Sequence, residues 1–373
     1  MPRVLVDLLS YTGTKGGMEV YTREVYRRLG PLAPDWEFVG FFSREGYALD
    51  RSWFPGDAID SGISGENRFA WAWGELASVS RAADRAQVDL VHSPATLGPR
   101  RTHMPLVVTM HDMLYWSHPE YMSTPLYTAP VKWMERIVSH AATVIITVSP
   151  GSASEIAKYL HVDPSGIEVV PLAGGHPRGV DRSLAGSEGP MILAMGNRRP
   201  HKNWGSLPRA LALLPESQRP RVVITGGRGD DPLQPLVDEL RVNDWVSLRG
   251  WVDDDEVAHL YSTATALAIP SLAEGFSLPA LEAMSAGVPV LLSDIDVHRY
   301  VGGGAARYFA PQDDASLATA IAEVITDPAL QARMSAEGKL QEKKFTWDRT
   351  AAETLDVFRR ALANSQPSGR ASR

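Results

Sequence analysis

The stretch ALAIPSLAEGFSLPALEAMSAGVPVLL, residues 266–292, contains a complete strand–helix–strand pattern. A short apolar run at 266–269 predicts a buried strand, residues 279–286 predict a helix, and a second apolar run at 288–292 predicts the next strand. Pro279 suits the first turn of that helix, where the missing backbone N–H has no intrahelical partner to lose. Strands that alternate with helices are typical of a parallel, doubly wound sheet.

The same alternation continues in both directions from this stretch. The predicted strands are 4–9, 37–42, 88–92, 106–111 and 143–148 in the first half, and 191–195, 221–225, 246–248, 266–269 and 288–292 in the second. The predicted helices include 19–29, 71–86, 203–214, 233–240, 254–262, 279–286 and 315–326. Each half therefore predicts its own α/β sheet.

A segment rich in glycine and proline separates the two halves. We expect an N-terminal Rossmann-like domain at 1–171, a linker at 172–190 and a C-terminal Rossmann-like domain at 191–346. A last helix at 347–363 has no strand after it, so it packs on one of the two domains, and we assign it to the first. Residues 364–373 predict a disordered tail.

Composition limits the function classes. The 373 residues carry a net charge of −7, which argues against a nucleic-acid binder, and no apolar run approaches the ~20 residues that a bilayer-spanning helix needs. There is no cysteine, so disulfides, thiolate metal sites and thiol nucleophiles are excluded. We expect a cytoplasmic protein. Weak peripheral contact with the inner face of a membrane stays an open alternative.

Two strand-to-helix turns have the chemistry of phosphate sites. Gly16 and Gly17 end a glycine loop after the first strand, where backbone N–H groups can approach an anion closely. The alternative is a plain tight turn, because the loop is neither a G-x-G-x-x-G fingerprint nor a Walker loop. In the second half, GNRRPHKN at 196–203 gathers Arg198, Arg199 and Lys202, the usual partners of a diphosphate. The alternative there is a solvated basic turn.

Two glutamates eight positions apart suggest a sugar site. Glu274 lies in the loop after the strand at 266–269 and can accept hydrogen bonds from sugar hydroxyls, and Glu282 can accept two from the vicinal hydroxyls of a ribose. The intervening backbone N–H groups can hold phosphate or sugar oxygens, since they open a helix. They belong to Gly275, Phe276, Ser277 and Leu278. The alternative is that Glu282 merely complements the helix dipole.

These motifs together resemble those of a known family. EGFSLPALE, with its Glu-x7-Glu spacing, is similar to the signature of the retaining glycosyltransferases of family 4, which have the GT-B fold. The resemblance includes GGMEVYTREVYRRL from residue 16, VVTMHDMLYW at 107–116, TVSPGSASEIAKYL at 147–160, GNRRPHKN and LRGWVDDDEVAHLYSTATALAIPSLAEGF at 248–276. It covers nearly the whole chain and points to bacterial mannosyl- and rhamnosyltransferases. It implies two domains that face each other across a cleft.

The resemblance implies roles for particular residues. Glu274 resembles the glutamate that binds the donor hexose, Glu282 the one that holds the ribose, and Lys202 the lysine that contacts the diphosphate. Gly16 and Gly17 are similar to the glycines beside the donor phosphates. Trp251 and Val252, with Gly250, occupy the stretch that usually surrounds the nucleobase, and His111 matches a histidine close to the transferred sugar.

The sequence departs from the family pattern at two positions. Asn197 stands where many members have an arginine, and either Arg198 or Arg199 substitutes for it. Tyr300 stands where many members have an acid, with no assigned consequence.

His111 allows three readings. It is a hydrogen-bonded structural group, a general base oriented by Asp112, or, as the resemblance implies, a residue that positions the sugar. We expect the last, because in retaining transferases of this type the departing phosphate takes the acceptor's proton. Lys202 and a neighbouring arginine then stabilise the leaving diphosphate.

We expect no metal and no cofactor beyond the substrate. Asp253–Asp255 predicts a helix cap rather than a metal motif. Aromatic residues of the first half either stack on an acceptor or pack the core. They are Trp71, Trp73, Tyr115, Trp116, Tyr121, Tyr127 and Trp133.

The sequence thus predicts a metal-independent, retaining hexosyltransferase. Its donor is a nucleoside-diphosphate sugar, with GDP-mannose as the first choice, and its acceptor is a glycan, a lipid-linked precursor or a small natural product. The alternatives are a noncatalytic nucleotide-sugar binding protein and a phosphorylase that uses pyridoxal phosphate.

Overall fold

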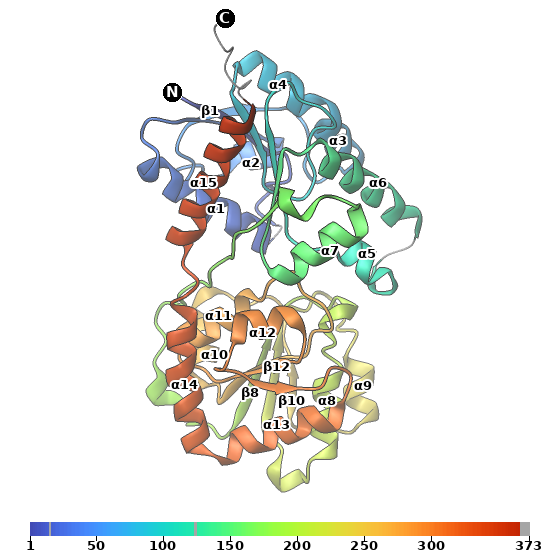
Figure 1. Cartoon of the computed structure of the whole chain (residues 1–373). Helices are drawn as coiled ribbons and strands as arrows, with labels where there is room; N and C mark the ends of the chain where they lie inside the picture. The colour runs from blue at the N-terminus through green and yellow to red at the C-terminus, as the bar shows by residue number, and fades with distance from the viewer. Residues whose placement is uncertain (15, 123–124, 366–373) are drawn as a thin grey trace, which may run out of the picture. The chain divides into compact units, whose positions relative to one another are not determined.

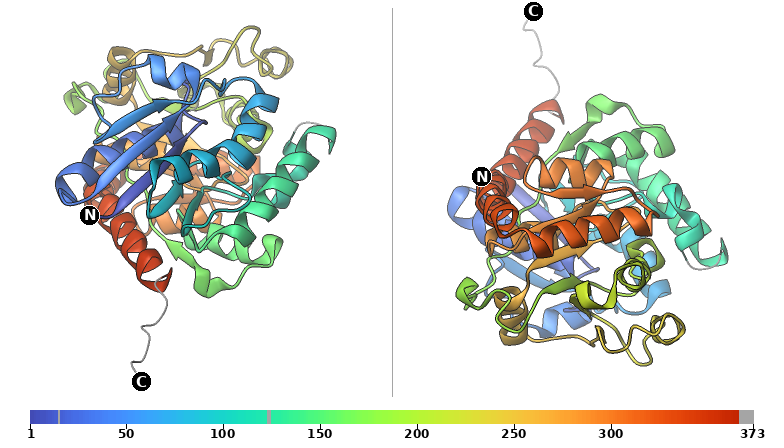
Figure 2. Two further views of the ribbon diagram at one scale, coloured as in Figure 1. Left: turned by 90° about the horizontal axis from the view of Figure 1, so that it is seen from above. Right: turned by 90° about the horizontal axis from the view of Figure 1, so that it is seen from below.

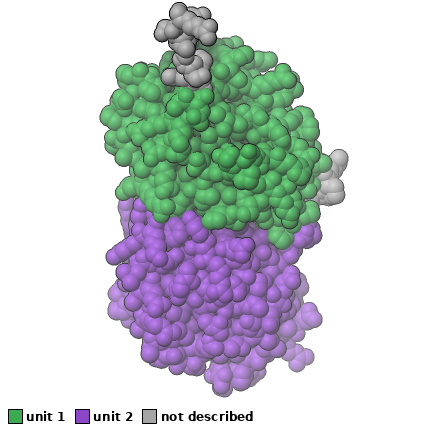
Figure 3. All heavy atoms as spheres, in the orientation of Figure 1, with its two compact units in different colours: residues 1–119, 123–172, 347–373 green, residues 120–122, 173–346 purple. Residues whose placement is uncertain are grey.

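The computed structural model describes residues 1–14, 16–122 and 125–365. The chain divides into two units, which Figure 3 colours separately. Unit 1 comprises Met1–Pro119, Ser123–Leu172 and Trp347–Arg373, and unit 2 comprises Glu120–Met122 and Ala173–Thr346. Of the tail predicted at 364–373, the structure describes only the first two residues, and these belong to the last helix.

Unit 1 contains a seven-stranded sheet in the order β3-β2-β1-β4-β5-β6-β7, with every neighbouring pair parallel (Figure 1). Its strands are β1 (Arg3–Leu8), β2 (Glu37–Phe42), β3 (Asp57–Asp60), β4 (Leu90–Ser93), β5 (Leu106–Met110), β6 (Val144–Thr147) and β7 (Ile167–Val169). Its helices are α1 (Gly17–Leu32), α2 (Arg44–Ala48), α3 (Arg68–Trp73), the π-helical turn η1 (Gly74–Ser78), α4 (Val79–Ala86), α5 (Leu114–Ser117), η2 (Pro119–Tyr121), α6 (Pro125–Ala141), α7 (Pro150–Leu160) and η3 (Pro164–Gly166).

The C-terminal helix α15 (Trp347–Ser365) returns to unit 1 and packs on α1, where Figure 2 shows the two side by side. Two polar contacts fix its first turns. Asp348 accepts from the Arg28 guanidinium at 2.6 Å, and the Thr350 hydroxyl donates to the carbonyl of Pro171 at 2.7 Å. Phe358 is fully buried, which gives the helix its apolar anchor.

Unit 2 contains a six-stranded parallel sheet in the order β10-β9-β8-β11-β12-β13. Its strands are β8 (Met191–Met195), β9 (Arg221–Thr225), β10 (Val246–Leu248), β11 (Ala266–Ile269), β12 (Val290–Ser293) and β13 (Arg307–Phe309). Its helices are η4 (Arg182–Leu184), η5 (Pro200–Lys202), α8 (Ser206–Leu213), η6 (Glu216–Gln218), α9 (Gln234–Glu239), α10 (Asp254–Thr263), α11 (Leu278–Ser285), α12 (Asp296–Gly302), α13 (Asp314–Thr326) and α14 (Pro328–Glu342).

The prediction of two doubly wound parallel sheets is confirmed. The sequence analysis missed the strands β3, β7 and β13, which lie at sheet edges and have only three or four residues each. The predicted linker at 172–190 is not a free segment, because all of it after Leu172 belongs to unit 2. Arg182 anchors that part by donating to the carbonyls of Tyr261 and Ala264, at the end of α10.

Because every strand pair is parallel, the carboxyl ends of the strands meet at one edge of each sheet, and the loops that follow them gather there. In unit 2 this edge carries the loops after β8, β11 and β12. Within the described ranges, no helix is long and apolar enough to cross a bilayer.

Candidate active site

Glu274 lies in the loop between β11 and α11, and its carboxylate is held by two donors. The ammonium of Lys202 approaches Oε1 at 2.6 Å, and the hydroxyl of Ser271 donates to the same oxygen at 2.7 Å. The two charged side chains are only 9% and 19% exposed, so this is a largely desolvated ion pair. No hydrogen bond of the described residues uses Oε2, which leaves that oxygen available to a ligand.

The backbone brings Lys202 to this place. Pro200 starts the 3₁₀ turn η5, and Asn203 ends it with φ of 52°, a left-handed conformation that asparagine tolerates better than most residues. The carbonyl of His201 accepts from the backbone N–H of Leu272 at 2.8 Å. The loop after β8 is thereby tied to the loop after β11, and Lys202 and Glu274 are fixed opposite each other.

The electrostatics keep Glu274 ionised. Burial raises the pKa of its carboxyl, but the charge of Lys202 and the hydrogen bonds from Lys202 and Ser271 outweigh burial, so the pKa lies below its ordinary value. The site therefore holds a carboxylate at neutral pH. A buried carboxylate with an open oxygen is a strong acceptor for hydroxyl donors.

His298, which the sequence analysis missed, stands beside this pair. The Ser293 hydroxyl at the end of β12 donates to the carbonyl of Ser271, and His298 Nδ1 lies 2.9 Å from the carbonyl of Ser293. A carbonyl only accepts, so Nδ1 carries the proton; burial lowers the pKa of His298, and the ring is neutral. Its Nε2 is a buried acceptor with no partner among the residues that the structure describes.

A second buried polar atom without a partner lies at the start of α11. Ser277 is 1% exposed, and its hydroxyl neither caps the helix nor meets any other partner within the described part of the chain. Buried polar groups are normally hydrogen-bonded, and orphans often mark a place where a ligand or water binds. Ser277 and His298 therefore indicate that polar groups of a ligand belong near Glu274.

Glu282 lies one turn into α11 in a more apolar setting. Its Oε2 is 3.4 Å from the Tyr261 hydroxyl, and burial raises the pKa of Glu282 to about 7, with hydrogen bonds from the Gly175 backbone and Tyr261 opposing the rise. The chain passes closely over this helix: a Cβ at Gly174 would lie 2.7 Å from that of Leu281. These two glycines fall in the predicted linker, so sequence reasoning gave them no role.

The two arginines of the basic turn differ sharply. The guanidinium of Arg198 is fully engaged in contacts within unit 2. It pairs with Asp231 at 2.8 Å and donates to the carbonyls of Thr225 and Ile224 at 2.7 and 3.0 Å. The prediction that Arg198 contacts the donor is therefore corrected: its guanidinium has a structural role. Arg199 is exposed and takes part in no ion pair of the described residues, so Arg199 is the arginine that remains available.

This contrast gives a stability prediction. Arg198→Ala leaves the largely buried Asp231 carboxylate without its cationic partner, so we expect the free energy of unfolding to fall by about 3–5 kcal/mol. Arg199→Ala is the matched control, with an expected change within about 0.5 kcal/mol because its side chain is exposed. Equilibrium denaturation in urea measures both. Equal stability of the two variants would contradict the structural assignment of Arg198.

The other residues of unit 2 that the sequence predicts to bind the donor follow β10 or lie near α11. Trp251 follows β10 and is 80% exposed, with Val252 half-buried beside it. Phe276 is buried against Phe345 at 5.9 Å between ring centroids, and Tyr300 packs on the same ring at 5.7 Å. Asp253 accepts from the N–H of Glu256 at 2.9 Å, which confirms the predicted helix cap. Leu278 and Gly275 complete the turn into α11.

In unit 1, His111 follows β5 at the corresponding sheet edge. Its Nε2 donates to the carbonyl of Pro94 at 2.9 Å, and burial lowers its pKa, so the neutral ring keeps Nδ1 as an acceptor. The ring stands edge-on to Tyr21 at 5.0 Å. Gly16 precedes α1 with φ of 61°, Gly17 begins that helix, and Lys15 lies outside the described residues.

The aromatic residues of unit 1 divide into two groups. Trp116 and Trp71 donate their indole N–H groups to Glu135 and Glu75 at 2.6 and 2.7 Å, so both are engaged in the fold. Trp73 and Trp133 are 67% and 54% exposed. The side chain of Tyr127 lies outside the described residues.

Comparison with known proteins identifies the family. Residues 15–174 match the description "Glycosyltransferase Family 4", and residues 180–341 match "Glycosyl transferases group 1". The chain is 30% identical over 286 residues to O-antigen chain mannosyltransferase B of Escherichia coli, a match that covers 72% of this chain and 74% of that protein. It is also 30% identical over 311 residues to MMP alpha-(1->4)-mannosyltransferase of Mycolicibacterium hassiacum, covering 76% and 73%.

Solved structures agree on the architecture. Sucrose-phosphate synthase of Thermosynechococcus elongatus superimposes with a TM-score of 0.78 at 20% identity, covering 98% of this chain and all of that one. At this identity the similarity establishes the fold. Together with the matching families and the two mannosyltransferases, it shows that the chain belongs to glycosyltransferase family 4 and is a glycosyltransferase with the GT-B fold.

Proposed function

We propose that this enzyme transfers a hexose from a nucleoside-diphosphate sugar to a hydroxyl acceptor, with retention of configuration and without a metal ion. The observation that carries the proposal is the desolvated Lys202–Glu274 pair, with an open carboxylate oxygen and two orphan polar atoms around it. A hexose beside a diphosphate supplies hydroxyl donors for the oxygen and anionic acceptors for the ammonium.

The hexose is assigned to the Glu274 side of the site. Oε2 of Glu274 accepts one sugar hydroxyl, and Nε2 of His298 accepts a second. Two fixed acceptors discriminate between hexoses, because a sugar that points a hydroxyl elsewhere leaves a buried acceptor unpaired. His111 of unit 1 stays our proposed sugar-positioning residue, with its Nδ1 as acceptor.

The diphosphate is assigned to Lys202 and Arg199, with the N-terminus of α11 as a further donor. Ser277 offers its hydroxyl there, and the first backbone N–H groups of the helix have no intrahelical partner. The ribose is assigned to Glu282, and the base to Trp251 and Val252. These assignments follow the order sugar, diphosphate, ribose and base along one donor.

The proposed chemistry needs no protein nucleophile. The bond between the anomeric carbon and the diphosphate oxygen breaks, and the acceptor oxygen bonds to the same carbon on the same face. The acceptor's proton passes to the departing phosphate oxygen. Lys202 and Arg199 stabilise the charge that develops on the leaving diphosphate, which is the largest contribution that a protein makes to such a step.

The relatives favour mannose as the transferred sugar, and we propose GDP-mannose as the donor. A panel of nucleotide sugars tests this by thermal shift, because a ligand at 100 times its Kd stabilises the fold by about 2.7 kcal/mol. GDP-mannose should raise Tm more than GDP-glucose or UDP-glucose. A panel that leaves Tm unchanged throughout would contradict the proposed function. The proposed acceptor is a glycan, a lipid-linked precursor or a small natural product, met in the cytoplasm or at the membrane's inner face.

The pKa of Glu282 gives a pH prediction for donor binding. Only the carboxylate accepts two ribose hydroxyls, and with a pKa of about 7 the ionised fraction rises roughly tenfold between pH 6 and pH 8. The affinity for a nucleotide sugar should therefore increase by about the same factor over that interval, as measured by calorimetry. Glu282→Gln should bind more weakly and remove this dependence. A pH dependence that survives in Glu282→Gln would place the titrating group elsewhere.

A further inference from the structure

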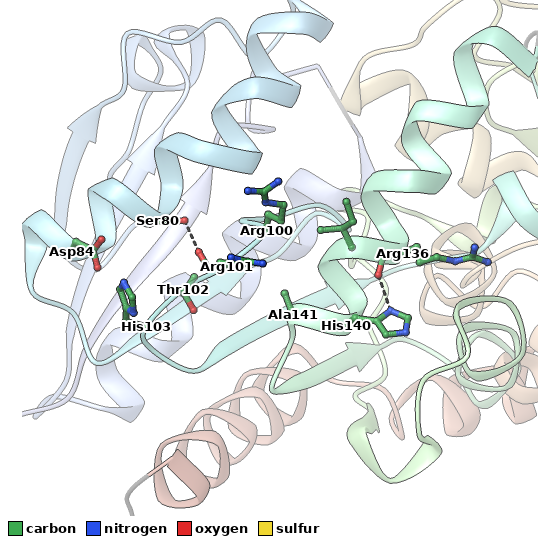
Figure 4. Close-up of a pocket in the computed structure, with 10 residues that line it drawn as sticks. Ser80, Asp84, Arg100, Arg101, Thr102, His103, Arg136, His140 and Ala141 are labelled. Atoms are coloured by element: carbon green, nitrogen blue, oxygen red, sulfur yellow. Dashed lines mark hydrogen bonds between the residues drawn. The ribbon is translucent and has the colours of Figure 1, made fainter.

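We infer that unit 1 contains a second ligand site, a cationic pocket that binds a phosphate ester. The pocket has a volume of about 890 Å³ and lies between α4, α6 and the loop that precedes β5 (Figure 4). Its polar lining includes Ser80 and Asp84 of α4, Arg100, Arg101 and His103 of the loop, and His140 of α6. None of these residues belongs to the site described above.

The position of the pocket separates it from the catalytic edge of the sheet. The loop with Arg100 and Arg101 leads into the start of β5, and α6 ends just before β6, so the pocket adjoins the amino ends of both strands. His111 follows the carboxyl end of β5. Five residues of strand span about 16 Å, which is the distance along the sheet between the two ends.

The charges of the pocket are open to a ligand. Arg100 and Arg101 are exposed, and in the described part of the chain neither guanidinium forms an ion pair or a hydrogen bond. Arg136 also borders the pocket, but its guanidinium stacks on the Trp116 ring at 5.0 Å. Asp84 is the one acidic residue among those that line the pocket, so the arginines give the pocket a net positive charge, which favours an anion.

Hydrogen bonds hold two parts of the pocket wall in place. The Ser80 hydroxyl donates to the carbonyl of Arg101 at 2.7 Å, which ties the loop to α4. On α6, His140 Nδ1 donates to the carbonyl of Arg136 at 2.8 Å, which holds the ring beside the opening. The loop is therefore tied to α4, and the His140 ring is held on α6, beside the space that Figure 4 shows.

The size and lining define the class of ligand. Guanidinium groups bind phosphate oxygens through paired N–H donors. The volume falls in the range of small-molecule sites and greatly exceeds one phosphate, and Ile137 and Ala141 supply an apolar wall. The ligand is thus a phosphate attached to a larger organic part. Both a soluble phosphate ester and the headgroup of an anionic phospholipid have this chemistry.

The experiment uses the full chain in a Lys202→Met/Glu274→Gln background, which weakens phosphate binding at the donor site. Calorimetry with glucose 6-phosphate, a soluble phosphate ester, tests the soluble source. Sedimentation with vesicles of phosphatidylglycerol and phosphatidylcholine, against pure phosphatidylcholine, tests the lipid source. For whichever probe binds, Arg100→Glu/Arg101→Glu should weaken the affinity at least tenfold, and Asp84→Asn should strengthen it.

Arg81→Glu/Arg85→Glu is the matched control, because it makes the same charge change on exposed arginines of α4 that do not line the pocket. This control should retain the interaction. Loss of glucose 6-phosphate binding in the loop variant, but not in the control, identifies a soluble ester, and loss of vesicle binding identifies a headgroup. The inference is overturned if neither probe binds, or if both arginine pairs have equal effects. If the loop variant fails to fold, Arg100→Gln/Arg101→Gln replaces it.

Discussion

We expect Lys202→Met to lower kcat/KM for hexose transfer by about 10²–10³, because it removes the cation that we assign to the leaving diphosphate. The ammonium is pre-oriented by Glu274 at 2.6 Å and is only 19% exposed, so its field acts in a poorly solvated site where it is stronger than in water. Methionine keeps most of the side-chain volume. Steady-state kinetics with GDP-mannose, with melting curves to verify folding, measure the effect.

Lys339→Met is the control for this variant, since Lys339 is an exposed lysine of the same unit that lies on α14. It should leave kcat/KM within about twofold, as surface substitutions usually do. The double variant Lys202→Met/Glu274→Gln should cost less than the sum of the two single variants, because the two side chains form one pair. If Lys202→Met left turnover unaffected, the assignment of the diphosphate to Lys202 would be contradicted.

Glu274→Gln produces a loss of similar size by a different route. The amide has nearly the same shape, but it lacks the charge that pairs with Lys202 and that we propose accepts a hexose hydroxyl. We expect kcat/KM to fall by about 10²–10³, since interactions with charged groups are strongest in such a site. The variant should still bind GDP within about threefold of the wild type, because GDP carries no hexose.

Glu282→Gln supplies the complementary pattern. It should weaken GDP and GDP-mannose equally, since both ligands contain the ribose, whereas Glu274→Gln weakens only the ligand that contains the sugar. Calorimetry with the two ligands separates these effects. If Glu274→Gln weakened GDP as much as GDP-mannose, the hexose would not lie at Glu274.

Much of the fold follows from local patterns in the sequence. Central strands such as Met191–Met195 and Ala266–Ile269 are continuous apolar runs, as strands buried on both faces must be. The helix α14 was not predicted, because its buried residues include Gly338, Gln341 and Glu342, which do not form an apolar stripe. The predicted helix at 71–86 is interrupted by the π-helical turn Gly74–Ser78, for which the sequence has no local signal.

The candidate site was foreseeable where its residues share one loop, and not where they depend on distant partners. Glu274 and Glu282 are recognised by their spacing around a glycine and a proline. Arg198 was misassigned because its partner Asp231 is 33 positions away, and no local pattern links them. His298 was missed because its role arises only when β12 pairs with β11 and aligns Ser293 with Ser271.

The most direct test is the crystal structure of the full chain with its tightest-binding nucleotide sugar. We expect a hexose hydroxyl within hydrogen-bond distance of Glu274 Oε2, the diphosphate against Lys202, and the ribose hydroxyls on Glu282. A donor bound in the opposite direction, or one that contacts neither glutamate, would contradict the assignment of this site.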